Sequence, residues 1–329
     1  MDEIDSSAEL LDATGRWRAR DVSYWTGRWD RLSRLVPAFT IEPFKVHPDA
    51  PANPHIKTVV RQPLAVTEQP IPVGTVSNSY QLAQHHEVVK RCFEGLRLVG
   101  VDPSSAKCEV GLTPLGEWMN FRAYFPDSHN YTPLDGKPLG LRLECFNSVD
   151  GSSRLVILLG WLRLVCLNGL VILETKATLR DVHDEHLNLD AIPDMVVAGM
   201  NAVGEDLRRI KGWEAAEVTS ASLKEWANGK LSEKWGKKAA CRAFHICVNG
   251  RDVEIVDPFA KGEATEKPVK STIDVPGAAR PAKTLYYVSQ ALSWVATQRS
   301  NTEERVEWQG AIPELIVSLR AGAAARSAT

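Results

Sequence analysis

The spacing of apolar residues changes three times along the chain. Between residues 96 and 125 apolar and polar residues alternate loosely around glycines and a proline, which predicts short antiparallel strands. In residues 138–146 every second side chain is apolar, which places Arg142 and Glu144 together on the opposite face of a strand. From residue 192 to residue 210 apolar residues return every three or four positions, as in an amphipathic helix. The chain therefore changes from strands to helices as it proceeds.

The sharpest contrast lies in residues 147–172, where the polar segment NSVDGSSR precedes the most apolar run of the chain. Asp150-Gly151 supplies the backbone freedom that a chain reversal needs, so this segment is predicted to be a hairpin loop. Residues 155–167 would form the second strand, apolar on both faces and central in its sheet. The loop would present several polar residues together at one end of the sheet: Asn147, Asp150, Ser152, Ser153 and Arg154.

The remaining segments complete an α+β prediction. Eight prolines between residues 37 and 72 exclude a long helix there, and residues 73–94 change from strand to turn to helix. Helices are expected near residues 284–296 and after residue 301, and Ser222 with Glu225 has the spacing of a capping box. The fold predicted is an antiparallel-rich sheet with packed helices, followed by a helical C-terminal region. Five regions are expected: a basic, aromatic helix with a Pro-rich arm (1–54), an α+β core (55–180), a helical region (181–256), a flexible connection (257–283) and C-terminal helices (284–329).

Composition limits the classes of partner. The chain has 329 residues, of which 44% are hydrophobic, and a net charge of −2, so a nucleic acid could be met only by a local basic patch. Its six cysteines form no CxxC pair, which is typical of reduced core thiols and predicts a cytoplasmic protein. The acidic N-terminus resembles no secretory signal. Arg163 and Asn168-Gly169 interrupt the apolar run, so no membrane span is expected.

Two basic segments interleaved with tryptophan are the main indication of a partner. Lys and Arg neutralise phosphates, and unpaired bases stack on aromatic rings at ~1–3 kcal/mol each. The alternative is a pair of amphipathic helices with buried tryptophans and solvated lysines. The predicted nucleic-acid-binding residues are Arg16, Arg18, Arg20, Trp226, Lys230, Lys234, Trp235, Lys237 and Lys238.

The sequence gives less support for catalytic or metal-binding residues than for nucleic-acid-binding residues. Adjacent His85 and His86 would point about 100° apart on a helix, and His183 with His186 has no third ligand at a diagnostic spacing. Cys166 lies between apolar strand residues, and no GxSxG, Walker or dinucleotide motif is present. Asp150, the loop serines and Asn168 have a structural alternative, since such side chains often bind the backbone of their own turn. No catalytic residue, metal or cofactor is predicted.

Two motifs in the same order resemble those of the phage/plasmid-like proteins known as domain of unknown function 932. The downstream motif comprises Asn147, Ser148, Asp150, Gly151, Ser152 and Ser153, followed by Arg163, Val165, Cys166 and Asn168. The upstream motif comprises Gly74, Val76, Ser77 and Tyr80. His85 stands where the family usually has Asn, and Leu167 where it usually has Gln. The resemblance covers residues 70–180 and, more loosely, 284–315.

This resemblance implies a setting in phages, plasmids and integrated elements, near DNA replication or recombination functions. Combined with the basic, Trp-containing segments, it favours non-catalytic binding or annealing of single-stranded nucleic acid. The motif residues Tyr80, Arg154, Arg163 and Asn168 would line the site together with the loop. Two alternatives stay open, namely a protein-interaction factor that modifies a host system and a metal-dependent hydrolase or nuclease. A homo-oligomer also stays open.

Overall fold

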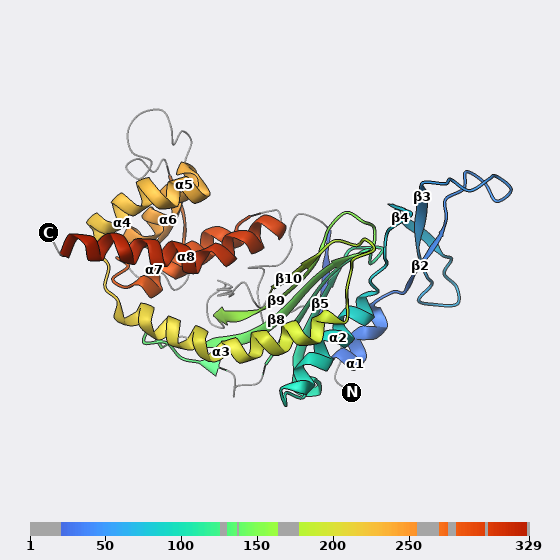
Figure 1. The fold of residues 1–329 in the computed structure, drawn as a ribbon, viewed down its shortest axis with the longest axis horizontal. Helices are drawn as coiled ribbons and strands as arrows, with labels where there is room; N and C mark the ends of the chain where they lie inside the picture. Colours follow the sequence, from blue (N-terminus) through green and yellow to red (C-terminus); the bar gives the residue numbers. More distant parts are fainter. Residues whose placement is uncertain are drawn as a thin grey trace.

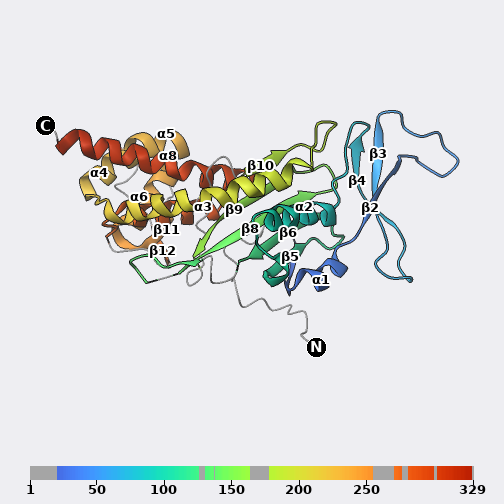
Figure 2. The same cartoon turned by 60° about the horizontal axis from the view of Figure 1, so that its bottom comes forward.

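The computed structural model describes residues 21–125, 130–136, 138–163, 178–254, 270–275, 281–299 and 302–327. Its centre is a seven-stranded antiparallel sheet, with helices α2 (His85–Leu98) and α3 (Ala191–Ala215) on one face (Figures 1 and 2). A cluster of helices from the C-terminal part of the chain lies at one end. The α+β class predicted from the sequence is confirmed.

The strands of this sheet are mostly neighbours in sequence. In sheet order they are β1 (Ser23–Gly27), β5 (Lys107–Leu112), β6 (Trp118–Tyr124), β8 (Leu139–Ser148), β9 (Leu155–Arg163) and β10 (Thr178–Asp181), with β7 (Asn130–Tyr131) beside β8. Part of the N-terminal prediction is wrong, because residues 23–27 form an edge strand instead of a helix. Only the short α1 (Trp29–Leu32) and the 3-10 turn η2 (Ser33–Leu35) follow it.

The predicted hairpin is present. β8 ends at Ser148 and β9 begins at Leu155, and Phe146 pairs with Val156 next to the turn. The alternating residues of β8 are buried against the face that α2 covers, as the period of two requires. β9 lies between β8 and β10, which explains why a strand can be apolar on both faces.

The other face of the sheet holds a buried ionic network. The Arg122 guanidinium pairs with Glu109 at 2.9 Å and with Glu144 at 2.8 Å, and Arg142 pairs with Glu144 at 2.7 Å. Burial alone would raise the pKa of Glu144, but Arg122 and Arg142 lower that pKa to about 2. Since breaking such a network would leave a buried charge without its counter-ion, the four side chains specify the register of three strands.

A second, three-stranded sheet stands at the end of the molecule away from the C-terminal helices (Figure 1). Its strands are β2 (Phe39–Pro43), β3 (Ile56–Arg61) and β4 (Ile71–Ser77). These short strands confirm that the Pro-rich segment is extended. The sheet meets the main body through a small cluster in which Val76 of β4 packs with Val149, the first residue after β8.

The C-terminal half is mainly helical, as predicted. Its helices are α4 (Ser220–Trp226), the π-helical turn η6 (Ala227–Leu231), α5 (Ser232–Trp235), α6 (Lys237–Asn249), α7 (Leu285–Thr297) and α8 (Thr302–Ser327). The capping box of α4 joins the N-cap residue Thr219 to Ser222. The predicted box of Ser222 and Glu225 is therefore wrong, because the helix begins three residues earlier than that pair implied. Within the predicted connection 257–283, residues Lys270–Asp274 form β12, which pairs with β11 (Arg251–Glu254).

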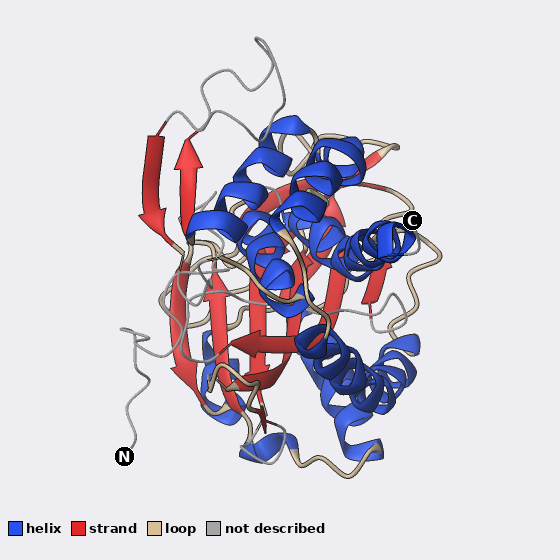
Figure 3. Ribbon diagram, turned by 90° about the vertical axis from the view of Figure 1, so that its left-hand side faces the viewer, coloured by secondary structure: helices blue, strands red, loops and turns tan. Residues whose placement is uncertain are grey.

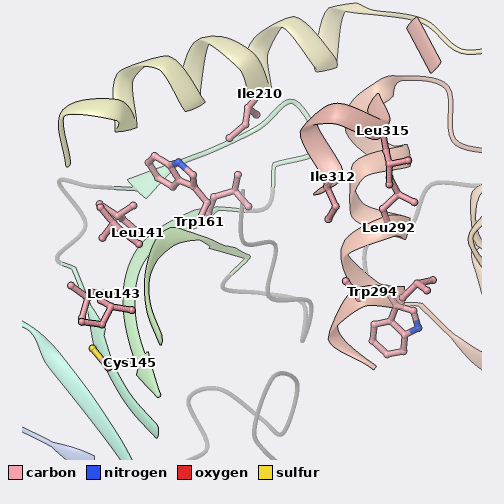
Figure 4. Packing of buried hydrophobic residues seen from close by; sticks show 14 of the residues in the cluster. Leu141, Leu143, Cys145, Trp161, Ile210, Leu292, Trp294, Ile312 and Leu315 are labelled. Atoms are coloured by element: carbon pink, nitrogen blue, oxygen red, sulfur yellow. The ribbon is translucent and has the colours of Figure 1, made fainter. Parts of the chain in front are cut away.

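One hydrophobic cluster joins the sheet to the C-terminal helices. Trp161 of β9 lies between Leu141 and Ile210 of α3, and Ile312 and Leu292 continue the packing into α8 and α7 (Figure 4). Viewed from their own end of the molecule, the C-terminal helices lie in front of the sheet (Figure 3). Burial of each such side chain contributes ~1.5–3 kcal/mol, so the sheet and these helices depend on each other.

Two further sequence expectations concern the cysteines and the membrane. Cys92, Cys108, Cys145, Cys241 and Cys247 are free and buried, and Cys166 lies outside the described residues. Burial raises the pKa of the Cys108 and Cys247 thiols to about 12, which suppresses the reactive thiolate. No helix in the described ranges combines the length and the apolar character that a membrane crossing needs.

Candidate functional site

Gly74 brings the upstream motif against the hairpin loop. A Cβ atom at Gly74 would lie 2.8 Å from Cβ and 2.9 Å from Cα of Asp150, so only glycine permits this approach of β4 to the loop. Gly151 has a φ of +78°, a left-handed conformation that favours glycine, and it faces Val76 and Tyr80. Two motifs about 70 residues apart in sequence thus form one surface.

The hairpin loop is held by its own polar side chains. Asp150 Oδ1 accepts hydrogen bonds from the backbone N–H and the hydroxyl of Ser152, at 3.1 and 2.5 Å. The Ser148 hydroxyl accepts from Ser153 N and donates to Ser153 O, both at 3.0 Å. Trp118 Nε1 donates to Ser152 Oγ at 2.7 Å. Asp150 and the serines therefore bind the backbone and side chains of their own turn, as the structural alternative predicted. These bonds fix the shape of the loop.

A polar groove of about 590 Å³ lies between this loop, β4 and the segment before α3. We call it the motif groove. Arg154 on its rim is exposed and makes no ion pair with any described residue. Its lining residues are Thr75, Val76, Ser77, Tyr80, Gly151, Ser152, Ser153, Arg154, Val182, His183 and Asp184.

Tyr80 and His183 form one wall of the motif groove. Their rings are parallel, with centroids 5.3 Å apart and an interplanar angle of 7°. The Tyr80 hydroxyl donates to Ser148 O at 3.3 Å, and burial followed by the nearby Asp150 carboxylate raises the pKa of Tyr80. His183 Nδ1 donates to Gln81 O at 3.3 Å, while Gln81 N donates to His183 O at 3.2 Å. These bonds fix the segment 182–184 against the residues just before α2.

Asn147 and His85 lie behind the motif groove and not in it. Asn147 Nδ2 donates to Ala83 O at 2.8 Å and to His85 Nδ1 at 2.9 Å, and His85 Nε2 donates to Gly116 O at 2.9 Å. Both side chains are buried. Burial lowers the pKa of His85 to about 4, so its imidazole is neutral at pH 7. The prediction that Asn147 lines the site is wrong because its side chain points to the core side of β8.

Arg163 does not converge with the loop either. It is the last residue of β9 and pairs with Leu139, at the far end of a nine-residue strand, so its backbone lies ~26 Å from Leu155. Asn168 and the arginines 16, 18 and 20 lie outside the described residues.

The predicted basic, Trp-containing patch at residues 226–238 exposes little indole surface. Trp226 and Trp235 are each only 7% exposed; Trp226 Nε1 donates to Ser318, and Trp235 stacks on Trp308 at 4.5 Å. The base-stacking role predicted for Trp235 is therefore wrong, because its ring already stacks inside the core. Trp226 is equally buried but borders a pocket of about 260 Å³ that Lys230 and Glu233 also line, so its role stays a prediction. The lysines differ among themselves: Lys230 pairs with Glu233, Lys234 pairs with Glu314, and Lys237 and Lys238 are exposed.

This patch and the motif groove do not form a continuous trough. The patch lies in η6, α5 and α6 at the C-terminal end of the molecule, whereas the groove adjoins β4 at the other end (Figures 1 and 2). The single surface predicted from the two sets of residues is therefore wrong.

The histidine pairs hold structural positions. His86 Nε2 bonds Val36 O at 3.0 Å, and His85 uses both ring nitrogens as described above. His183 is bound to Gln81, while His186 is largely exposed beside Glu185. Within the described part of the chain, no three His, Cys, Asp or Glu side chains gather as a metal site would require.

Sequence reasoning missed several residues of the motif groove. Thr75 was only part of a strand pattern, and Trp118, which holds the loop in place, carries no local signal. His183 was noticed for its spacing from His186, but its actual partner is Tyr80, 103 positions earlier. Contacts over such separations are not encoded in local periodicity.

Comparison with known families agrees with this geometry. The sequence profile of the family described as Domain of unknown function (DUF932) matches residues 72–273, more than half of the chain. The chain belongs to the DUF932 family. No curated protein and no solved structure matches it. The DUF932 match begins in β4 and includes every residue that lines the motif groove.

Proposed function

We propose that this DUF932 protein binds single-stranded nucleic acid without covalent catalysis, in the DNA metabolism of mobile elements, and that the strand's phosphates lie in the motif groove. The observation that supports this most is the convergence of both family motifs and residues 182–184 on one polar groove with Arg154 at its rim. The predicted lysine patch is not needed for this arrangement.

The lining chemistry suits a phosphate backbone. Contacts to nucleic-acid phosphates come from arginine, from serine, threonine and tyrosine hydroxyls and from backbone N–H groups. The motif groove offers Arg154 together with the hydroxyls of Thr75, Ser77 and Ser153. Its volume of about 590 Å³ falls within the ~300–1,000 Å³ range of ligand sites, which suits a short stretch of strand.

The groove is also prepared before a ligand arrives. Asp150, Ser148 and Trp118 hold the loop through hydrogen bonds of 2.5 to 3.2 Å, and the contact at Gly74 fixes its position against β4. A site with few side chains left to order loses less conformational entropy on binding. This preparation of the groove supports a binding role for the loop and β4, and such a role needs no nucleophile.

The test is fluorescence anisotropy with a labelled single-stranded oligonucleotide. We expect binding that weakens as salt rises, and a loss of affinity of tenfold or more in Arg154→Glu, because the change reverses a charge beside the phosphates. Lys237→Glu is the matched control, since it makes the same charge change on an exposed residue at the other end of the molecule. Equal losses in both variants, or no salt-sensitive binding by the unaltered protein, would refute the proposal.

A further inference from the structure

A second, smaller pocket lies at the opposite end of α2 from the motif groove. It has a volume of about 170 Å³ and is bounded by α1, the last turns of α2 and the 3-10 turn η3 (Pro103–Ser105). Its lining residues are Arg28, Trp29, Asp30, Phe93, Arg97, Pro103 and Ser104. Arg28 and Trp29 of this pocket belong to the basic, aromatic region expected within residues 1–54.

The floor of this pocket is aromatic and rigid. The Trp29 ring meets Phe121 edge to face at 5.1 Å and Phe93 at 6.3 Å. Phe93 is buried, whereas Trp29 is only partly buried. The core therefore fixes the indole while part of it stays open to a ligand, in contrast to Trp235, which is buried against Trp308.

The rim carries two guanidinium groups. Arg28 is 61% exposed and pairs with Asp30 at 3.3 Å, an exposed ion pair that a stronger anion can displace. Arg97 is exposed and makes no ion pair with any described residue. The other nearby carboxylate, Asp102, already accepts hydrogen bonds from the backbone and hydroxyl of Ser104. Asp102 also interacts electrostatically with Arg97 and Arg28, so an anionic group at the rim competes with two carboxylates for these two guanidinium groups.

We infer that this pocket receives one unpaired pyrimidine base of the bound strand, stacked on Trp29, with the adjoining phosphate at Arg97. A cavity of ~150 Å³ holds a single benzene ring, so a pocket of about 170 Å³ suits a six-membered ring better than a fused purine. This inference rests on the proposed function. The helix α2, 14 residues or ~21 Å long, runs from the segment beside the motif groove to this pocket, and its length equals that of about six stacked nucleotides.

The experiment compares oligo-dT and oligo-dA of twelve nucleotides by anisotropy. The unaltered protein should prefer oligo-dT, and Arg97→Gln should weaken oligo-dT binding about fivefold or more, which is the scale of one base and phosphate contact. Trp29→Phe, which keeps an aromatic core side chain, should reduce the preference for oligo-dT. The matched control is Arg34→Gln, because Arg34 is exposed near α1 but does not line the pocket.

The results separate this inference from the proposed function. Oligonucleotide binding that needs Arg154 but is unchanged in both Arg97→Gln and Trp29→Phe would overturn the pyrimidine pocket and leave the motif groove standing. If no oligonucleotide binds, titration with thymidine monophosphate followed by NMR decides the pocket alone. Binding that Arg97→Gln weakens would support the pocket, and no binding at millimolar nucleotide would overturn it.

Discussion

His85 and Asn147 show how one buried pair can support the loop beside it. His85 Nε2 donates to Gly116 O, so Nδ1 must be the acceptor for Asn147 Nδ2. The family usually has Asn at position 85, and a neutral imidazole likewise supplies one donor and one acceptor. This tautomer exists only while His85 is uncharged, which burial ensures by lowering its pKa to about 4.

Stability should therefore fall on acidification. The pKa of His85 is about 4 in the folded protein and 6.5 for the free side chain. Between these two pH values the unfolded state binds a proton at His85 and the folded state does not. The contribution of neutral His85 to the free energy of unfolding is fully present above pH 6.5. It is lost as the pH falls to about 4, by up to ~3 kcal/mol. Urea unfolding between pH 7 and pH 4 measures it, and His85→Asn should reduce the slope. Parallel pH curves for the two proteins would contradict this role.

At this scale the sequence located the right loop but not the direction of its side chains. Asn147 and Arg154 looked equivalent as polar neighbours, yet one is buried and the other is exposed on the rim of the groove. The alternation along β8 continues through Asn147, so its position on the apolar face could have been inferred. The stacking of His183 on Tyr80 could not be inferred from a local pattern.

At the scale of elements, the contact between β4 and the hairpin loop decides whether the motif groove exists. Gly74→Ala should destabilise the protein by about 1–3 kcal/mol, because the added methyl would overlap the Asp150 backbone. It should also weaken oligonucleotide binding. Gly204→Ala in α3 is the matched control, since nothing lies within 4 Å of its Cβ position, and it should be neutral or stabilising. Thermal unfolding of both variants measures the difference, and equal unfolding temperatures would argue against a tight contact.

Substitutions in the helices around residues 226–238 should lower the stability of the protein without weakening oligonucleotide binding. Trp235 is buried and stacks on Trp308, so Trp235→Ala should cost about 3 kcal/mol of unfolding free energy. The affinity for oligonucleotides should change less than twofold at a temperature where the variant is folded. Chemical denaturation and anisotropy on the same sample provide both values. A folded variant that lost tenfold in affinity would restore the stacking role predicted from sequence.

Elements with a strong local signal were predictable. The apolar stripe of α3, the Asp-Gly turn and the Pro-rich strands each follow from a local rule. The edge strand β1 was missed because it pairs with β5, more than eighty residues later, and because the arginines on either side of it favoured a basic helix. The same local view hid the burial of Trp226, whose partner Ser318 lies 92 positions away.

At the scale of the whole molecule, sequence alone could not tell which basic residues share a surface. The lysines of α5 and α6 and the loop at β4 lie at opposite ends of the fold, and this separation follows from sheet order and helix packing (Figure 1). Both family motifs contribute residues to the motif groove. We therefore propose that binding takes place in this groove and expect that the lysines of α5 and α6 are not needed for it.

Photochemical cross-linking tests that assignment most directly. A single-stranded oligonucleotide containing bromodeoxyuridine is irradiated with the full-length protein, and the cross-linked peptides are identified by mass spectrometry. We expect cross-links in residues 75–80, 151–154 or 182–184, the segments that supply the lining of the motif groove. Cross-links confined to residues 224–238, with none at the groove, would contradict it.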